Sequence, residues 1–254
     1  MKLLNEFIGT NEYDKVLNFL PGDTEELFLE NLKTADNDWY YRNADITYSL
    51  NDNGHRCKNI RDIDLSNYVL FGGCSHTTGI GLELEKTYPY LISNMLGYDY
   101  YNLSMPGAGI DVMEYNILTW LGKISKKPKI VFIQLPDHTR FCTHNKHIGA
   151  DFFIESGSWA TDKGELDMIV NCEDIGFFNA RKHFTYENMF NVIDVPIVKI
   201  NVFGQNNQFD YDVKARGRDL ARDLCHLGIN SNLELTKNIY SFIQMRYPEL
   251  SKNI

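Results

Sequence analysis

The chain has 254 residues, enough for one large domain or for one domain with a modest extension. Hydrophobic residues make up 43% of it and aromatic residues 13%, which predicts a packed core and excludes a fibrous or disordered protein. The formal net charge of −9, with no large cluster of Lys and Arg, argues against a nucleic-acid-binding protein.

The first 50 residues are expected to form a mainly helical N-terminal extension. Pro21 and Gly22 break the helical pattern, and Asp23 or Thr24 could cap a second helix because a side-chain oxygen there accepts amide hydrogens of the first turn. This extension could pack on the main domain, mediate self-association or dock to a larger assembly.

From residue 51 onward, short apolar runs alternate with helical patterns. Strands are expected at 68–71, 98–103, 130–133 and 197–203, and helices at 84–96, 110–124, 184–192 and 233–245. Alternation implies parallel pairing through right-handed crossovers, and continuously apolar strands imply a sheet covered on both faces. We therefore predict an α/β domain over residues 51–254, a three-layer α/β/α sandwich with a mainly parallel sheet.

A long, less regular segment around 142–179 is predicted to be an insertion or lid, since long connections often carry function. Its aromatic residues are expected either to contact a sugar or acyl chain or to pack the segment onto the domain. They are Phe152, Phe153, Trp159, Phe177 and Phe178.

Cysteine usage and hydropathy indicate the compartment. The five cysteines are widely spaced without a C-x-x-C pair, so neither a disulfide framework nor a zinc motif is expected. The N-terminus has no apolar signal-peptide segment, and no apolar run approaches the roughly 20 residues of a membrane span. We expect a cytoplasmic protein; its richness in Asn and Tyr is compatible with an AT-rich genome, microbial or viral.

The segment after the first predicted strand, residues 72–79, is rich in glycine and contains Ser75. A serine just past a buried strand can be exposed by a sharp strand-to-helix turn, whose backbone amides can hold an oxyanion. An ordinary glycine-rich turn or a phosphate-binding loop is the alternative. The active site is expected here because ligands bind at the carboxyl ends of the strands in such folds.

Two later segments offer matching chemistry. Residues 102–109, after the second predicted strand, form a small-residue loop that could present another backbone amide. Near the C-terminus, Asp223 precedes His226 by three residues, so its carboxylate could orient the histidine as a base for a serine hydroxyl. Asp219 is an alternative carboxylate partner.

In this order, the three segments resemble the SGNH, or GDSL-type, hydrolase family. Gly73-Cys74-Ser75 stands where many members read Gly-Asp-Ser, and Asn102 through Gly107 match the second block. Asp223 and His226 match the last block, and Asn53-Gly54-His55-Arg56 is similar to an Asn-x-Gly-x-Arg segment of some members.

This resemblance implies a flavodoxin-like fold with a five-stranded sheet, and it assigns a role to each matching residue. Ser75 would attack the acyl carbon, His226 would be the base, and Asp223 would orient it. The backbone amides of Ser75 and Gly107 would donate to the oxyanion. Where the third block usually has an asparagine, this chain has Gln134, which either replaces that amide donor or lies at the edge of the core.

The function implied is that of a serine ester hydrolase with an acyl-serine intermediate and no cofactor. Its expected partner is a small-molecule or carbohydrate ester, such as an O-acetyl sugar, and neither a nucleic-acid partner nor a membrane span is expected. A non-catalytic binding module and an acyltransferase with the same triad are alternatives. The sequence predicts no oligomeric state.

A metal site is not expected. His138, His144 and His147 lie in one segment, but their spacing matches no recognised ligand pattern. A solvated or substrate-facing loop is the preferred interpretation.

Overall fold

The computed structural model describes residues 7–136, 140–144, 153–156, 175–202, 211–217 and 219–251. Its central sheet has five strands, all parallel, in the order β4-β3-β5-β8-β9. They are β3 (Tyr68–Gly72), β4 (Asp99–Asn102), β5 (Val131–Gln134), β8 (Ile197–Asn201) and β9 (Val213–Lys214). This is the flavodoxin-like order, so the predicted α/β fold with a five-stranded parallel sheet is confirmed.

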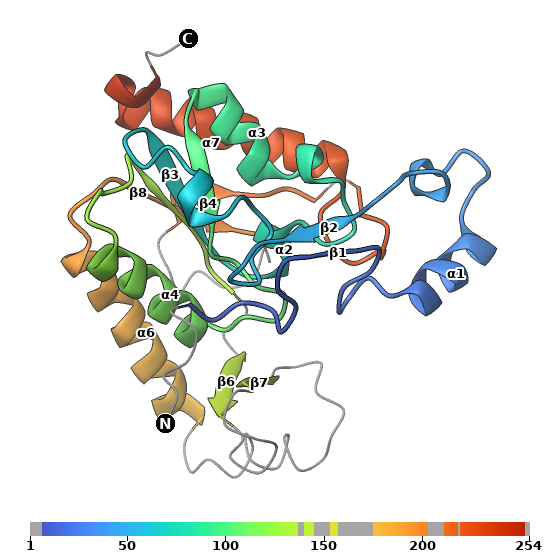
Figure 1. Cartoon of the computed structure of the whole chain (residues 1–254), viewed down its shortest axis with the longest axis horizontal. Helices are drawn as coiled ribbons and strands as arrows, with labels where there is room; N and C mark the ends of the chain where they lie inside the picture. Colours follow the sequence, from blue (N-terminus) through green and yellow to red (C-terminus); the bar gives the residue numbers. More distant parts are fainter. Residues whose placement is uncertain are drawn as a thin grey trace.

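Helices cover both faces of the sheet (Figure 1). On one face lie α3 (Tyr88–Leu96) and α7 (Ile229–Arg246), and on the other lie α4 (Ile110–Lys123) and α6 (Ile175–Val192). Successive strand residues point to opposite faces: Val69 and Phe71 pack with α3 and α7, whereas Leu70 packs with α4. This alternation produces two cores and the predicted three layers.

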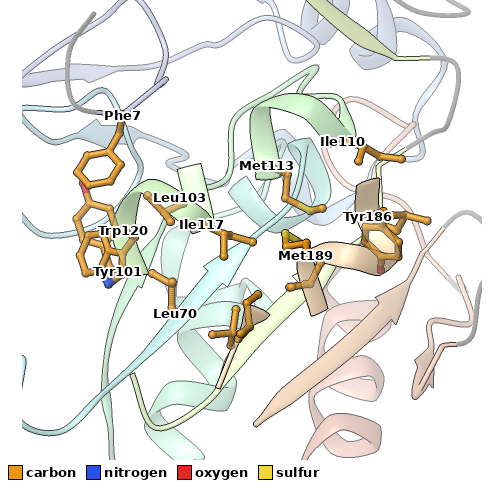
Figure 2. Packing of buried hydrophobic residues seen from close by; sticks show 14 of the residues in the cluster. Phe7, Leu70, Tyr101, Leu103, Ile110, Met113, Ile117, Trp120, Tyr186 and Met189 are labelled. Atoms are coloured by element: carbon orange, nitrogen blue, oxygen red, sulfur yellow. The ribbon is translucent and has the colours of Figure 1, made fainter. Parts of the chain in front are cut away.

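The core on the α4 face includes a residue from the N-terminal extension (Figure 2). The Phe7 ring lies 5.6 Å from that of Trp120, which in turn lies 4.4 Å from Tyr101. Trp120 also donates a hydrogen bond to the hydroxyl of Tyr68 at 2.9 Å. The extension is therefore anchored in the main core.

Residues 7–50 differ from the predicted mainly helical segment. They contain two short strands, β1 (Lys15–Leu17) and β2 (Tyr48–Leu50), which pair antiparallel. Their one α-helix is α1 (Glu25–Thr34), and a single 3-10 turn follows at Tyr40–Arg42. Thr24 is the N-cap of α1, accepting a hydrogen bond from the Leu27 amide at 3.2 Å.

Two helix boundaries differ from the predicted ones, at positions where side chains form hydrogen bonds with the backbone. The helix predicted at 84–96 divides into a 3-10 turn, Leu84–Lys86, and α3, because the Thr87 hydroxyl binds the Leu84 carbonyl at 2.7 Å. Helix α7 begins four residues before its predicted start at 233. The Asp219 carboxylate accepts hydrogen bonds from the Asn230 and Ser231 amides in its first turn, at 2.9 and 2.7 Å.

The described part of the predicted lid contains an antiparallel pair, β6 (Phe141–His144) and β7 (Phe153–Ser156), and the start of α6. Phe152 and Trp159 lie outside the described residues. Elsewhere, 3-10 turns occur at Ile60–Asp62 and Pro248–Ser251. Among the described helices, none is both long and apolar enough to cross a membrane.

His55 is fully buried and contacts both the N-terminal extension and the central sheet. Its Nε2 lies 3.1 Å from the Ile8 carbonyl, and its Nδ1 lies 3.2 Å from the Tyr101 hydroxyl. This geometry fits a neutral ring that donates through Nε2 and accepts at Nδ1. Burial lowers the pKa of His55 to about 4.

We expect His55 to make the fold sensitive to acid. Between pH 6.5 and 4 the unfolded chain binds a proton at this position that the folded chain does not, so stability falls as pH decreases, by roughly 3 kcal/mol in all. Urea unfolding at several pH values should show this slope in the wild type and a shallower one in His55→Gln. Parallel curves for the two proteins would contradict the prediction.

Candidate active site

Ser75 lies in the turn that follows β3, at the start of the four-residue helix α2 (Ser75–Thr78). Gly73 permits this turn, because a Cβ there would come within 2.3 Å of the Thr77 hydroxyl. Gly79 ends α2 in the left-handed region, with φ of 77°. The predicted sharp strand-to-helix turn is therefore present, and Ser75 is 5% exposed within it.

Ser75, His226 and Asp223 form one hydrogen-bonded chain. His226 Nε2 lies 2.7 Å from Ser75 Oγ, and His226 Nδ1 bonds to Asp223 Oδ2. Because Nδ1–H donates to the carboxylate, Nε2 is left to accept the serine proton. The structure thus brings Ser75 next to a pair of residues that lies about 150 positions later in the sequence. Such an arrangement can supply a nucleophile, a base and an orienting acid.

The segment from Asp223 to His226 is an irregular turn and contains no helix. Leu224 has a φ of 53°, a left-handed conformation that is uncommon for a residue with a side chain. Asp223 Oδ1 accepts hydrogen bonds from the Cys225 and His226 amides at 3.2 and 3.1 Å. The turn therefore fixes the carboxylate by its own backbone.

Gln134, at the end of β5, is fully buried and faces the turn around Ser75 (residues 73–79), called the nucleophile turn below. Its Oε1 accepts hydrogen bonds from the Cys74 amide at 3.0 Å, the Cys74 thiol at 3.1 Å and the Thr77 hydroxyl at 3.1 Å. Its Nε2 donates to the Leu135 carbonyl at 2.5 Å. In this arrangement the side-chain oxygen of Gln134 supports the turn, while its side-chain nitrogen donates to a backbone carbonyl.

We expect Gln134→Met to destabilise the protein and impair the site, because three buried donors would lose their acceptor. Each unsatisfied buried donor costs about 1–3 kcal/mol, and the turn around Ser75 would relax. Urea denaturation would measure the stability loss. A stability and kcat equal to those of the wild type would refute this supporting role.

The loop after β4 packs beside the nucleophile turn. Asn102 Nδ2 donates to the Thr77 carbonyl at 2.9 Å, and the Ser104 and Thr78 hydroxyls lie 3.0 Å apart. Gly107 lies in the following turn with φ of 81°, a conformation that favours glycine. The predicted second block therefore contacts the first.

Comparisons with known proteins find similarity only at the level of structure. No protein-family model and no curated protein matches the chain. One similar structure is a carbohydrate esterase family 2 enzyme with a carbohydrate binding domain from Corynascus thermopiles (Myceliophthora fergusii), at 14% identity and a TM-score of 0.40, covering 70% of this chain and 66% of that one.

Two further structures come from bacteria. A family two carbohydrate esterase from Clostridium thermocellum, in complex with cellohexaose, has 13% identity and a TM-score of 0.41 over 73% of this chain and 65% of that one. A lipolytic protein of the G-D-S-L family from Veillonella parvula has 11% identity and a TM-score of 0.32 over 70% and 73%. The chain spans about two thirds of the length of the two esterase structures.

The sheet order and the positions of the motifs on it identify the fold. Ser75 follows the first strand of the parallel sheet, and Asp223 and His226 precede its last helix. The chain has an SGNH-type hydrolase fold.

In this SGNH-type fold, Arg56 supports the segment that follows α2. Its guanidinium is buried and donates to four backbone carbonyls, at 2.6 to 3.3 Å. Three of them, from Thr78, Gly79 and Leu82, lie three to seven residues after Ser75. The sequence analysis singled out Arg56 as part of the segment Asn53-Gly54-His55-Arg56 but predicted no role for its side chain.

Sequence reasoning missed a buried ion pair that involves Arg222, the residue before Asp223. Arg222 Nε donates to Asp23 Oδ1 at 3.0 Å, and Arg222 Nη2 donates to Asp23 Oδ2 at 2.6 Å. The Tyr48 hydroxyl also bonds to Asp23. These contacts tie the N-terminal extension to the residue that precedes Asp223; the acceptor is nearly 200 residues away, so no local pattern could reveal it.

His76 lies beside the base, with its ring centroid 4.7 Å from that of His226. Burial holds the pKa of His76 well below its usual value, and the neighbouring His226 and Arg140 lower it further. A neutral ring at this position adds no positive charge next to His226 when that residue takes up a proton.

Asp223, Cys225 and His226 also offer three potential metal-ligand atoms within 4.8 Å of one another. However, the Asp223 and His226 atoms are bonded to each other, and burial with the nearby Asp223 raises the pKa of the Cys225 thiol. Metals bind the thiolate, so this group suits a triad better than a metal centre. His138 and His147 lie outside the described residues, as do the side-chain contacts of His144.

Proposed function

We propose that this protein is a serine ester hydrolase in which Ser75 attacks the acyl carbon. The observation that carries the proposal is the hydrogen-bonded chain from Ser75 Oγ through His226 to Asp223. His226 takes the serine proton during attack and returns it to the leaving alcohol, which departs and leaves an acyl-serine. Water then attacks the acyl-serine, with His226 again as the base; the bond between Ser75 Oγ and the acyl carbon breaks, the carboxylic acid leaves, and His226 returns the proton to Ser75.

The negative oxygen of the tetrahedral intermediate needs hydrogen-bond donors. We assign this role to the backbone amides of Ser75 and Gly107, on the nucleophile turn and on the loop packed against it. Gln134 is not assigned a direct role, because its amide nitrogen donates to the Leu135 carbonyl. Its contribution is to hold Cys74 and Thr77 on either side of the nucleophile.

Ester hydrolysis fits this geometry through chemistry that the chain supplies by itself: a nucleophile, a base and an orienting carboxylate. The substrate class that we propose is an acyl ester of a carbohydrate or related small molecule. The test is hydrolysis of p-nitrophenyl esters by the wild type and by Ser75→Ala, which should retain no activity above background.

A further inference from the structure

A pocket of about 600 Å³ lies between the N-terminal extension and the loop after β4. The extension contributes residues from two stretches, 9–12 and 17–24, and the loop contributes Met105 and Pro106. The side chains and backbone that line it are those of Gly9, Thr10, Asn11, Glu12, Leu17, Phe19, Leu20, Pro21, Thr24, Met105 and Pro106.

Each wall of this pocket includes a residue that adjoins the candidate active site. Pro21 lines the pocket, and a Cβ on the next residue, Gly22, would lie 3.8 Å from Cε1 of His226. On the other wall, Met105 packs in one apolar cluster with Cys74, which precedes the nucleophile. Through Gly22 and Met105, the walls of the pocket are thus connected to His226 on one side and to the turn around Ser75 on the other.

The polar side chains of the lining are mostly engaged elsewhere. The Thr10 hydroxyl donates to the Gly54 carbonyl at 2.9 Å, and the Thr24 hydroxyl caps α1. The Glu12 carboxylate pairs with Lys15. The groups that remain to meet a ligand are largely apolar: Leu17, Phe19, Leu20, Pro21, Met105 and Pro106.

We propose that this pocket binds an apolar group of the ester substrate that is larger than acetyl. The proposal rests on the esterase function proposed above and adds the part of the substrate that the extension recognises. Pockets of roughly 300–1,000 Å³ hold drug-sized ligands, so an acetyl group would leave most of this volume unfilled. Each methylene that enters it should raise kcat/KM by roughly fourfold.

The experiment compares p-nitrophenyl acetate with p-nitrophenyl octanoate in three proteins. Leu17→Trp fills the pocket from β1, and Val16→Trp is the matched control because Val16 is the neighbouring residue and is 66% exposed. The wild type and Val16→Trp should prefer octanoate. Leu17→Trp should lose roughly tenfold or more of kcat/KM on octanoate while keeping its rate on acetate. Octyl acetate, assayed in parallel, distinguishes an apolar alcohol part from an acyl chain.

A second measurement separates this inference from the proposed function. Calorimetry with octanoate and the Ser75→Ala protein should detect binding that a Leu17→Trp substitution in the same background abolishes. Such binding without any Ser75-dependent hydrolysis would preserve the pocket and refute the esterase. Ser75-dependent hydrolysis with equal rates on acetate, octanoate and octyl acetate, and with no effect of Leu17→Trp, would overturn the pocket alone.

Discussion

Ser75→Ala should abolish ester hydrolysis, with kcat falling by roughly 10⁶-fold, the loss seen when the nucleophile of a serine hydrolase triad is removed. The hydroxyl oxygen of Ser75 is the atom that would bond to the acyl carbon, and its proton is the one that His226 would accept. Alanine has neither. Because Ser75 is a small buried residue whose backbone forms the turn, alanine should preserve the fold. Initial rates on p-nitrophenyl acetate, butyrate and octanoate provide the measurement.

Ser66→Ala is the matched control for this experiment. Ser66 precedes β3, at the opposite end of that strand from Ser75, and its hydroxyl donates to the exposed Asp64 carboxylate at 2.6 Å. This variant should retain wild-type rates. A fluorophosphonate that labels the wild type and Ser66→Ala, but not Ser75→Ala, would identify the nucleophile independently of the ester chosen. Equal hydrolysis by wild type and Ser75→Ala would refute the role of Ser75.

The proximity of Ser75, Asp223 and His226 could be predicted from the sequence because each of them occupies a locally recognisable setting. Ser75 follows an apolar strand between glycines, and Asp223 precedes His226 by three residues. Alternating strands and helices imply a parallel sheet, and such a sheet gathers the ends of its strands at one edge. Local pattern and topology together therefore bring these side chains close, as the 2.7 Å distance between Ser75 and His226 requires.

Contacts that depend on long-range packing could not be predicted in this way. The choice between the two roles for Gln134 depends on whether the oxygen or the nitrogen of its side-chain amide meets Cys74. That contact forms only because β5 pairs with β3, which lies about 60 residues earlier in the sequence. The extension showed helical patterning, but Phe7 and Leu20 are buried against parts of the domain distant in sequence. Tertiary burial overrides weak local propensity in such segments.

The buried pair of Asp23 and Arg222 is the long-range contact with the largest expected effect. Asp23 and Arg222 side chains are 1% and 5% exposed, so Asp23→Ala would leave the guanidinium charge buried without its carboxylate. Loss of one partner of a buried ion pair costs about 3–5 kcal/mol. We expect a decrease of that size in the free energy of unfolding, measured with urea.

Lys58→Ala is the control for this loss, because Lys58 pairs with Asp99 at 3.0 Å from an exposed position. Exposed pairs contribute about 1 kcal/mol or less, so this variant should be nearly as stable as the wild type. A stability loss for Asp23→Ala no greater than that of Lys58→Ala would contradict the assignment of Asp23 as the anchor of Arg222.

The same pair should also affect catalysis, because Arg222 is held from several sides directly before Asp223. Its amide donates to the Gly81 carbonyl at 3.1 Å, and its carbonyl accepts from Asn31 at 3.0 Å. If these contacts position the carboxylate, Asp23→Leu combined with Arg222→Met should recover stability by replacing the pair with apolar groups, yet still show a lowered kcat with little change in KM. Recovery of kcat together with stability would mean that the pair only stabilises the fold. A lowered kcat in the stable double variant would mean that the N-terminal extension positions the catalytic turn.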